Sequence, residues 1–305
     1  MNRWIKRSFI GMAVVAALGV GALSAAAFYG DSKMKRSVEL PIAAHDHAIP
    51  LREDSASIEH GRYLFQARGC MECHGEDGGG RLFLQDPKTG MRVAGPNISS
   101  APESSVAHYQ ATDWARTLRH GVKPSGQPLM VMPSEDYARM SDEDLADLVA
   151  YIRQLPPVNG SERVMDLPVP VLALYGMGAI QDAAEKIDHS LPPQAAITAA
   201  TSLEYGAYVG QTCKGCHGAT LTGGKIPGSP PDWPAAANLT SGDGGALVRY
   251  ADVTAFKTMM RSGLRPDGSA VSSVMPFPAL SRMNDLDLEA LYLYLQSLPA
   301  GPVGS

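Results

Sequence analysis

The sequence carries one pentapeptide pattern twice, as Cys70-Met71-Glu72-Cys73-His74 and as Cys213-Lys214-Gly215-Cys216-His217. The pattern Cys-x-x-Cys-His is typical of covalent haem attachment, in which the two thiols form thioethers and the histidine binds the iron. In a helical turn, residues three and four apart share a face, so each set of two cysteines and one histidine would project to one side. The four cysteines of the chain are all used by the two motifs. We therefore predict two covalently bound haem c groups, held through Cys70, Cys73, Cys213 and Cys216, with His74 and His217 as iron ligands.

A single motif of this kind has other interpretations, namely a zinc site, a redox Cys-x-x-Cys or a disulfide. Zinc would need four ligands in one site. A thioredoxin-like motif would need a βαβ context, which the sequence does not indicate. Two matches that leave no cysteine unused favour haem.

The second axial ligand of each iron is predicted to be a methionine. Met132 and Met275 are each followed by proline, and each lies 58 residues after the histidine of its motif. Histidine–methionine ligation raises the haem potential and fills both axial positions, which suits outer-sphere electron transfer and leaves no open site for substrate. Met140 and Met283 repeat with the same offset and are the alternatives, although methionine often fills gaps in cores. Three histidines, His108, His120 and His189, are further alternatives, but none of them repeats in both halves of the chain.

The two motifs belong to a longer internal repeat with an offset near 143 residues. The two copies have matching residues before each motif, in the expected middle helix and at the C-terminal end of each copy. Examples are Gly61 and Gly206, Tyr63 and Tyr208, Asn97 and Asn238, Tyr151 and Tyr294, and Pro156 and Pro299. Asn97 and Asn238 could bind a haem propionate or cap a turn. Apolar residues recur at helical spacing behind Ser141, and strand signals are sparse, so each copy of roughly 100 residues is expected to be a small helical domain.

These residues resemble the class I cytochrome c fold, here in tandem. The resemblance implies that the first and last helices of each domain cross where a glycine meets an aromatic residue. It also implies an axial methionine in the loop before the last helix, which favours Met132 and Met275. The sequence is also similar to multi-haem cytochrome c subunits of membrane-bound dehydrogenases, which usually carry three haems where this chain has two motifs. The expected fold class is all-α, with two tandem cytochrome c domains after an N-terminal transmembrane helix.

The N-terminal segment is expected to anchor the chain in a membrane. Three basic residues, Arg3, Lys6 and Arg7, precede an apolar run from Phe9 to Tyr29 that is long enough to cross a bilayer. Positive charge ahead of the run predicts that the rest of the chain lies outside the cytoplasm. A cleavable signal peptide is the alternative, because Ala25-Ala26-Ala27 would suit a signal peptidase. We expect a single-pass protein of the bacterial inner membrane with both haem domains in the periplasm.

The expected organisation has six segments. They are an anchor or signal peptide (1–30), a tether (31–54), domain 1 (55–157), an interdomain segment (158–200), domain 2 (201–300) and a tail (301–305). The interdomain segment contains the apolar run 169–175, which is too short to span a membrane. We expect this run to pack between the domains, or alternatively to rest on the bilayer surface.

Composition and motifs together predict an electron-transfer protein with no catalytic residues of its own. The net charge is −5 and no basic stripe is present, so nucleic acid is not expected as a partner. Electrons would come from a dehydrogenase or a quinol-oxidising complex and leave to a terminal oxidase or another cytochrome. One alternative is the cytochrome c subunit of a periplasmic dehydrogenase complex. Another is a di-haem peroxidase, which would need one open axial position.

Overall fold

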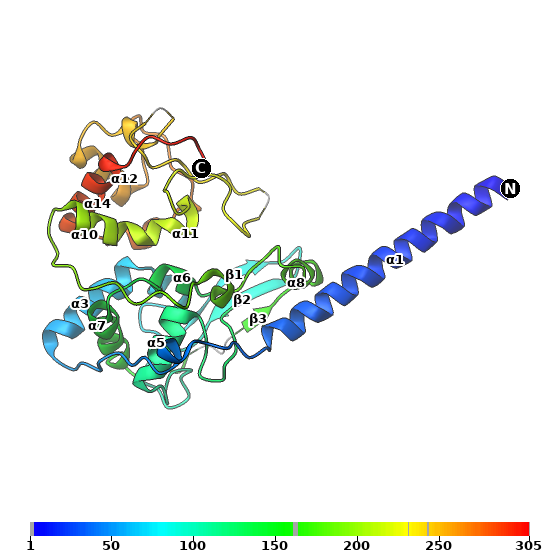
Figure 1. Ribbon diagram of the computed structural model, residues 1–305, viewed down its shortest axis with the longest axis horizontal. Helices are drawn as coiled ribbons and strands as arrows, with labels where there is room; N and C mark the ends of the chain where they lie inside the picture. The colour runs from blue at the N-terminus through cyan, green and yellow to red at the C-terminus, as the bar shows by residue number, and fades with distance from the viewer. Residues whose placement is uncertain (1–2, 161–163, 231, 243, 305) are drawn as a thin grey trace.

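A computed structural model describes residues 3–160, 164–230, 232–242 and 244–304. Helix α1 (Arg3–Met34) extends away from a body made of two stacked helical units (Figure 1). The side chains of Arg3 and Lys6, two of the basic residues expected to orient the anchor, lie outside the described part. Part of the interdomain segment, residues 161–163, also lies outside it.

The first unit is built on two helices that cross at a glycine. It contains α3 (Ser55–Ala67), α4 (Cys70–His74), α5 (Ala111–His120), α6 (Ser134–Tyr137) and α7 (Asp142–Arg153). A Cβ atom on Gly61 of α3 would collide with the Asp147 carbonyl of α7 and lie 2.9 Å from the Tyr151 Cβ. Only glycine allows this approach, so the predicted glycine–aromatic crossing is present. Its core contains Leu64, Phe65, Trp114, Leu145, Leu148 and Val149.

The second unit repeats this arrangement. It contains α10 (Leu203–Val209), η1 (Gly210–Cys213), α11 (Lys214–His217), η2 (Leu247–Arg249), α12 (Val253–Ser262), α13 (Phe277–Leu280) and α14 (Asp285–Ser297). A Cβ atom on Gly206 of α10 would collide with the Ala290 carbonyl of α14 and lie 2.7 Å from the Tyr294 Cβ. Each unit therefore has a hydrophobic core around one glycine crossing, and Ala67 of the first unit is buried in the core of the second.

A small antiparallel sheet, which the all-α prediction did not include, lies beside the first motif. It consists of β1 (Arg81–Asp86), β2 (Met91–Gly95) and β3 (Val164–Asp166), in the order β1-β2-β3. The register pairs Asp86 with Met91 across the hairpin and Arg92 with Asp166 on the other side. Gly90, at φ 76°, closes the hairpin. The sheet was missed because β1 is largely exposed and shows no alternation of apolar and polar residues.

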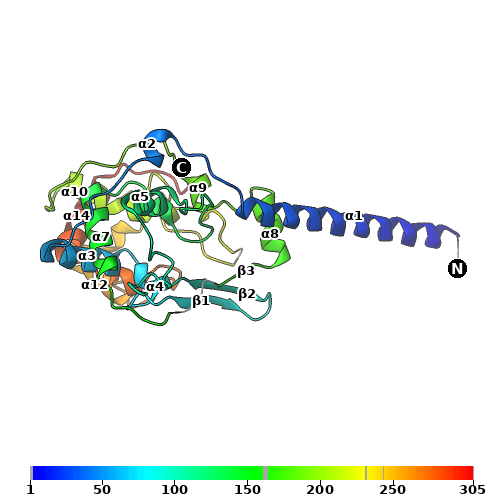
Figure 2. The ribbon, with the colours of Figure 1, turned by 90° about the horizontal axis from the view of Figure 1, so that it is seen from below.

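Short helices complete the chain between these units. They are α2 (Ile42–His45), α8 (Val169–Gly176) and α9 (Ala183–Lys186). The prediction that the apolar run 169–175 packs between the domains is wrong, because α8 packs against the C-terminal end of α1 (Figure 2). Pro168 before this run and Gly178 after it limit the helix to two turns, which pack against the C-terminal end of α1.

Among the described residues, α1 is the one helix long and apolar enough to cross a membrane. Its segment Arg7–Met34 has a hydropathy of 2.1, and none of its most apolar window is buried in the protein. An N-terminal helix of this kind is a candidate for a membrane anchor or for a signal sequence.

Candidate functional site: two candidate haem centres

The two Cys-x-x-Cys-His motifs adopt nearly the same local structure. The first is the five-residue helix α4, and the second spans the junction of η1 and α11. Each motif ends at a glycine with φ 78°, Gly75 or Gly218, a backbone conformation that favours glycine. Because each motif makes one helical turn, its cysteines and histidine share a face, as predicted.

Each motif histidine is oriented by one backbone carbonyl. The His74 Nδ1 lies 3.0 Å from the Pro96 oxygen, and the His217 Nδ1 lies 2.7 Å from the Ala237 oxygen. A carbonyl can only accept, so Nδ1 carries the proton and Nε2 keeps its lone pair for a metal. Burial lowers the pKa of both histidines, which favours the neutral ring that binds iron. These donors fit the axial position of a haem.

The motif cysteines do not have the character of redox or zinc-binding thiolates. Burial raises the pKa of Cys70 to about 12 and that of Cys213 to about 11. Reactive cysteines instead have a lowered pKa. No group of three or more His, Cys, Asp or Glu side chains in the described part of the chain could hold a metal ion. The two motifs therefore do not combine into one four-ligand site.

The two Met-Pro pairs share an unusual turn. Pro133 has φ −80° and ψ 63°, and Pro276 has φ −79° and ψ 63°. In both, the amide two residues after the methionine donates to the methionine carbonyl at 2.8 Å. This is an inverse γ-turn, and its repetition presents Met132 and Met275 in the same way at the edge of each core.

The alternative ligands lie elsewhere. Met140 and Met283 are buried in the cores, with exposed fractions of 4% and 6%, so they fill space as structural residues do. Two of the candidate histidines, His120 and His189, contact each other with their Nδ1 atoms 3.1 Å apart. His108 is exposed on a loop. The geometry favours Met132 and Met275 over these five residues.

Asn97 and Asn238 hold the loops that carry the histidine-orienting carbonyls. Each asparagine is buried, and its side-chain oxygen accepts from the amide two residues later at 2.9 Å. Each amide group donates to the chain that follows the last helix, at Val158 or Gly301. The asparagines thus cap turns, which is one of the two interpretations of the sequence.

The starts of the two motifs are joined directly. Arg68, two residues before the first motif, donates to the Thr212 hydroxyl at 3.2 Å, one residue before the second motif. Helix α6, which follows Met132-Pro133, lies against η1 and α11 of the second unit. Its Asp136 carboxylate is close enough to the backbone of Gly215 that a Cβ there would lie 2.5 Å away. The fold therefore brings the two candidate haem centres to one interface.

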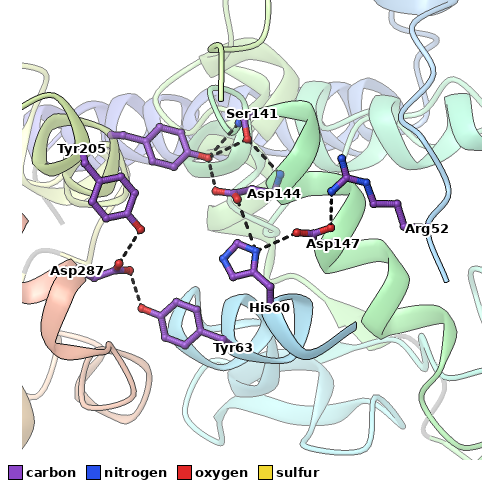
Figure 3. A network of polar contacts seen from close by, with 9 residues as sticks. Arg52, His60, Tyr63, Ser141, Asp144, Asp147, Tyr205 and Asp287 are labelled. Carbon is purple, nitrogen blue, oxygen red and sulfur yellow. Dashed lines mark hydrogen bonds and ion pairs between the residues drawn. The ribbon is translucent and has the colours of Figure 1, made fainter. Parts of the chain in front are cut away.

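A reciprocal pair of contacts locks that interface (Figure 3). The Tyr63 hydroxyl of the first unit donates to Asp287 of the second at 2.6 Å, and the Tyr208 hydroxyl donates back to Asp144 at 2.5 Å. Each hydroxyl also accepts an amide at the start of the partner helix, from Asn284 at 3.2 Å or Ser141 at 3.1 Å. Each tyrosine hydroxyl thus lies between two groups at the start of a helix in the other unit. One is the backbone amide of the N-cap residue, which has no partner within the helix, and the other is the carboxylate of the third helical residue. The helix is α14 for Tyr63 and α7 for Tyr208. Because the four side chains are repeat equivalents, the two units meet around a local pseudo-twofold axis.

The surroundings of the two carboxylates differ. Asp287 accepts a second tyrosine hydroxyl, that of Tyr205, at 2.7 Å. At the equivalent position in the first unit stands His60, whose Nδ1 lies 3.8 Å from Asp144. The same Nδ1 lies 3.0 Å from a neighbouring carboxylate, that of Asp147, to which Arg52 donates at 2.7 Å. Burial and the facing carboxylate raise the pKa of Tyr208 to about 12, so its hydroxyl stays a donor. The sequence reasoning noted Tyr63 and Tyr208 as repeat positions but gave them no role.

Comparisons with known proteins agree with these observations. Residues 58–156 match the family model described as cytochrome c. The chain is 25% identical over 301 residues to the cytochrome c subunit of alcohol dehydrogenase (quinone) from Gluconobacter oxydans (strain 621H), covering 89% of this chain and 61% of that protein. It is 28% identical over 281 residues to the fructose dehydrogenase cytochrome subunit of Gluconobacter japonicus, covering 82% and 54%. It is 26% identical over 278 residues to a diheme cytochrome c-type protein of Cereibacter sphaeroides, covering 81% and 87%.

The chain thus spans little more than half the length of the two dehydrogenase subunits, and most of the length of the diheme protein. The predicted resemblance to cytochrome c is confirmed for residues 58–156, and the chain is similar to proteins named as cytochrome c subunits of dehydrogenases and to a diheme cytochrome c. These relatives support electron transfer by a haem protein.

Proposed function

We propose that this protein is a membrane-anchored di-haem cytochrome c that takes electrons from a periplasmic dehydrogenase and passes them to a respiratory acceptor. The observation that carries the proposal is the repeated site: a Cys-x-x-Cys-His turn, a carbonyl-oriented histidine and a Met-Pro inverse γ-turn in both units. The matching relatives named as cytochrome c subunits of dehydrogenases support the choice of donor class.

The two sites are proposed to be equivalent in their ligands. Cys70 and Cys73 would hold one haem c, and Cys213 and Cys216 the other. His74 with Met132, and His217 with Met275, would be the axial ligands. When bound, haem supplies reversible one-electron chemistry, and closed axial positions suit outer-sphere transfer.

The protein's own residues would fix ligand identity and geometry. The carbonyls of Pro96 and Ala237 hold the histidine rings in one tautomer. The reciprocal tyrosine contacts and Arg68 hold the two units together, so the separation between the centres would not vary during transfer. The result would be a two-step relay within one chain.

The domain and membrane assignments are part of the same proposal. Residues 55–157 and 201–300 would be tandem cytochrome c domains, and 1–30 a retained anchor that places both domains in the periplasm. The packing of α8 against Ala26 and Gly30 supports retention, because cleavage after Ala27 would remove part of this contact.

Isolation of the full chain from membranes tests the donor class. Detergent extraction and affinity purification should yield a stoichiometric dehydrogenase subunit, and the substrate of that subunit should reduce the haem absorbance bands. A Cys213→Ala/Cys216→Ala variant should retain the partner and lose part of the reducible haem. If no co-purifying subunit reduced the haem, that result would count against a dehydrogenase as the electron donor.

A stand-alone carrier is the second candidate, and the relative from Cereibacter sphaeroides favours it because the match spans 87% of that diheme protein. In that case the haem protein would purify without a dehydrogenase and be reduced by a soluble donor or a quinol-oxidising complex. Rapid turnover of hydrogen peroxide by the purified protein would instead support the peroxidase alternative and contradict both electron-carrier proposals.

A further inference from the structure

Helix α8 lies antiparallel to the end of α1, and the two backbones touch. A Cβ atom on Gly30 would collide with the Leu172 carbonyl, and one on Gly176 would collide with the Ala26 carbonyl. Position 30 therefore pairs with 172, and position 26 with 176. Small residues four apart allow helices to approach this closely.

A charged and largely buried cluster lies beside α8 at the end of α1. Lys33 binds Glu185 at 2.7 Å, and Arg36 binds Asp182 at 2.6 Å. The Lys33 ammonium also donates to the Tyr175 carbonyl, in the last turn of α8, at 3.3 Å. The buried Tyr175 joins this cluster, because its hydroxyl accepts from Arg36 at 2.7 Å. The charged groups thus gather where α1 leaves its apolar stretch.

The exposed surface of α8, by contrast, carries no charge. The stretch 167–181 contains no Asp, Glu, Lys or Arg. Leu174 and Met177 are exposed by 41% and 63%, and on α1 the neighbouring Phe28 and Tyr29 are exposed by 78% and 59%. By the antiparallel pairing, Met177 lies level with Ala25, about 6 Å farther along α1 toward the bilayer than Tyr29 at 1.5 Å per residue.

We propose that the C-terminal end of α8 and the turn after it insert into the bilayer interface beside α1, as a second membrane contact. The inference rests on the proposed membrane anchor. The occupant of this surface is lipid, because the exposed apolar side chains of α8 continue the exposed apolar surface of α1. The ion pairs do not interrupt it, because their side chains are largely buried against the protein. An insertion of about 6 Å matches the depth at which interfacial helices settle. Two contacts would fix the tilt of the haem units on the membrane, which one flexible anchor would not.

Site-directed spin labelling of the haem-loaded full chain in phosphatidylcholine vesicles tests the proposal. Thioether formation leaves no native thiol, so one introduced cysteine is labelled uniquely. Met177→Cys is the test position, and Leu18→Cys, on α1 and 69% exposed, reports on the anchor. Leu203→Cys is the matched control: it is 50% exposed and begins α10, at the end of the body far from α1 (Figure 1).

We expect the Met177 and Leu18 labels to collide readily with oxygen and several-fold less with a water-soluble nickel chelate than the Leu203 label does. Suppose that the Leu18 label is exposed to lipid but the Met177 label is as accessible to the nickel chelate as the Leu203 label. That result would overturn this inference and leave the proposed anchor intact. Water exposure of the Leu18 label would instead overturn the anchor, and this inference with it. Shielding of the Met177 label from both reagents would show a protein contact, such as a second copy, and would also overturn the inference.

Discussion

The Tyr208→Phe substitution isolates one of the two reciprocal tyrosine contacts between the helical units. It removes a hydroxyl that donates to Asp144 at 2.5 Å and accepts from the Ser141 amide at 3.1 Å, while the buried ring stays in place. A hydrogen bond to a charged group contributes about 1.5–3 kcal/mol and a neutral one about 0.5–1.5 kcal/mol. The Asp144 side chain is 19% exposed, so water would replace part of the loss. We expect docking of the units to weaken by about 2 kcal/mol.

A change of about 2 kcal/mol raises the population of the undocked state roughly 30-fold. Amide hydrogen exchange of the haem-loaded protein measures this population at Asn284, because the Asn284 amide donates across the interface to the Tyr63 hydroxyl, which the substitution leaves in place. Exchange in peptides that contain Asn284 should therefore be roughly 30-fold faster in the variant. The repeat predicts the same increase at Ser141 for Tyr63→Phe, which leaves the Tyr208 hydroxyl in place.

Tyr292→Phe is the matched control, because its hydroxyl donates at 3.2 Å to the Tyr250 carbonyl within the second unit. It should lower the stability of that unit and leave exchange at Asn284 unchanged, because it removes no contact between the units. Unaltered exchange at Asn284 in Tyr208→Phe, or equal acceleration in the control, would refute the docking role of the reciprocal tyrosines.

Three further predictions concern the ligands, the helix crossing and a buried histidine. Met132→His and Met275→His should each lower one midpoint potential by more than about 59 mV, a tenfold change in a one-electron equilibrium, and an unchanged redox titration and visible spectrum would sink the methionine assignment. Gly206→Ala should force α10 from the Ala290 carbonyl and cost about 1–3 kcal/mol or more, seen as a lower denaturation midpoint, whereas Gly19→Ala, with open space around it, should leave the midpoint unchanged. Burial, together with the nearby His189 and Arg119, lowers the pKa of His120 to about 4. Between about pH 4 and 6.5 the unfolded chain therefore binds a proton at this histidine that the folded chain does not, so the free energy of unfolding falls by about 2 kcal/mol from pH 7 to pH 5. Urea denaturation at both pH values measures this loss, and a His120→Gln variant with the same pH dependence as the wild type would contradict it.

Local sequence patterns were sufficient for the parts of the fold that depend on neighbouring residues. The motif turns and the Met-Pro turns follow from spacing and from the restricted backbone of proline. The glycine crossings at Gly61 and Gly206 were expected from the resemblance to class I cytochrome c. The same features occur in both copies at matching spacing. A single accidental match would not be repeated together with its neighbouring features, so the repeat strengthens the interpretation of each copy.

Long-range pairing could not be obtained in this way. Strand β3 lies more than 65 residues after β2, and its three residues carry no strand signal of their own. The docking of α8 on α1 depends on backbone contact at Gly30 and Gly176, which are far apart in the sequence. The reciprocal tyrosine contacts had a usable signal, because Tyr63, Tyr208, Asp144 and Asp287 all repeat, but only the structure shows that each donor faces the acceptor of the other unit.

The haem content of the purified chain tests the central claim most directly. Intact-mass measurement together with haem quantitation should give two covalent haems per wild-type chain, and one each for Cys70→Ala/Cys73→Ala and Cys213→Ala/Cys216→Ala. One haem in the wild type, or no loss of haem in either variant, would contradict a relay built on two equivalent centres.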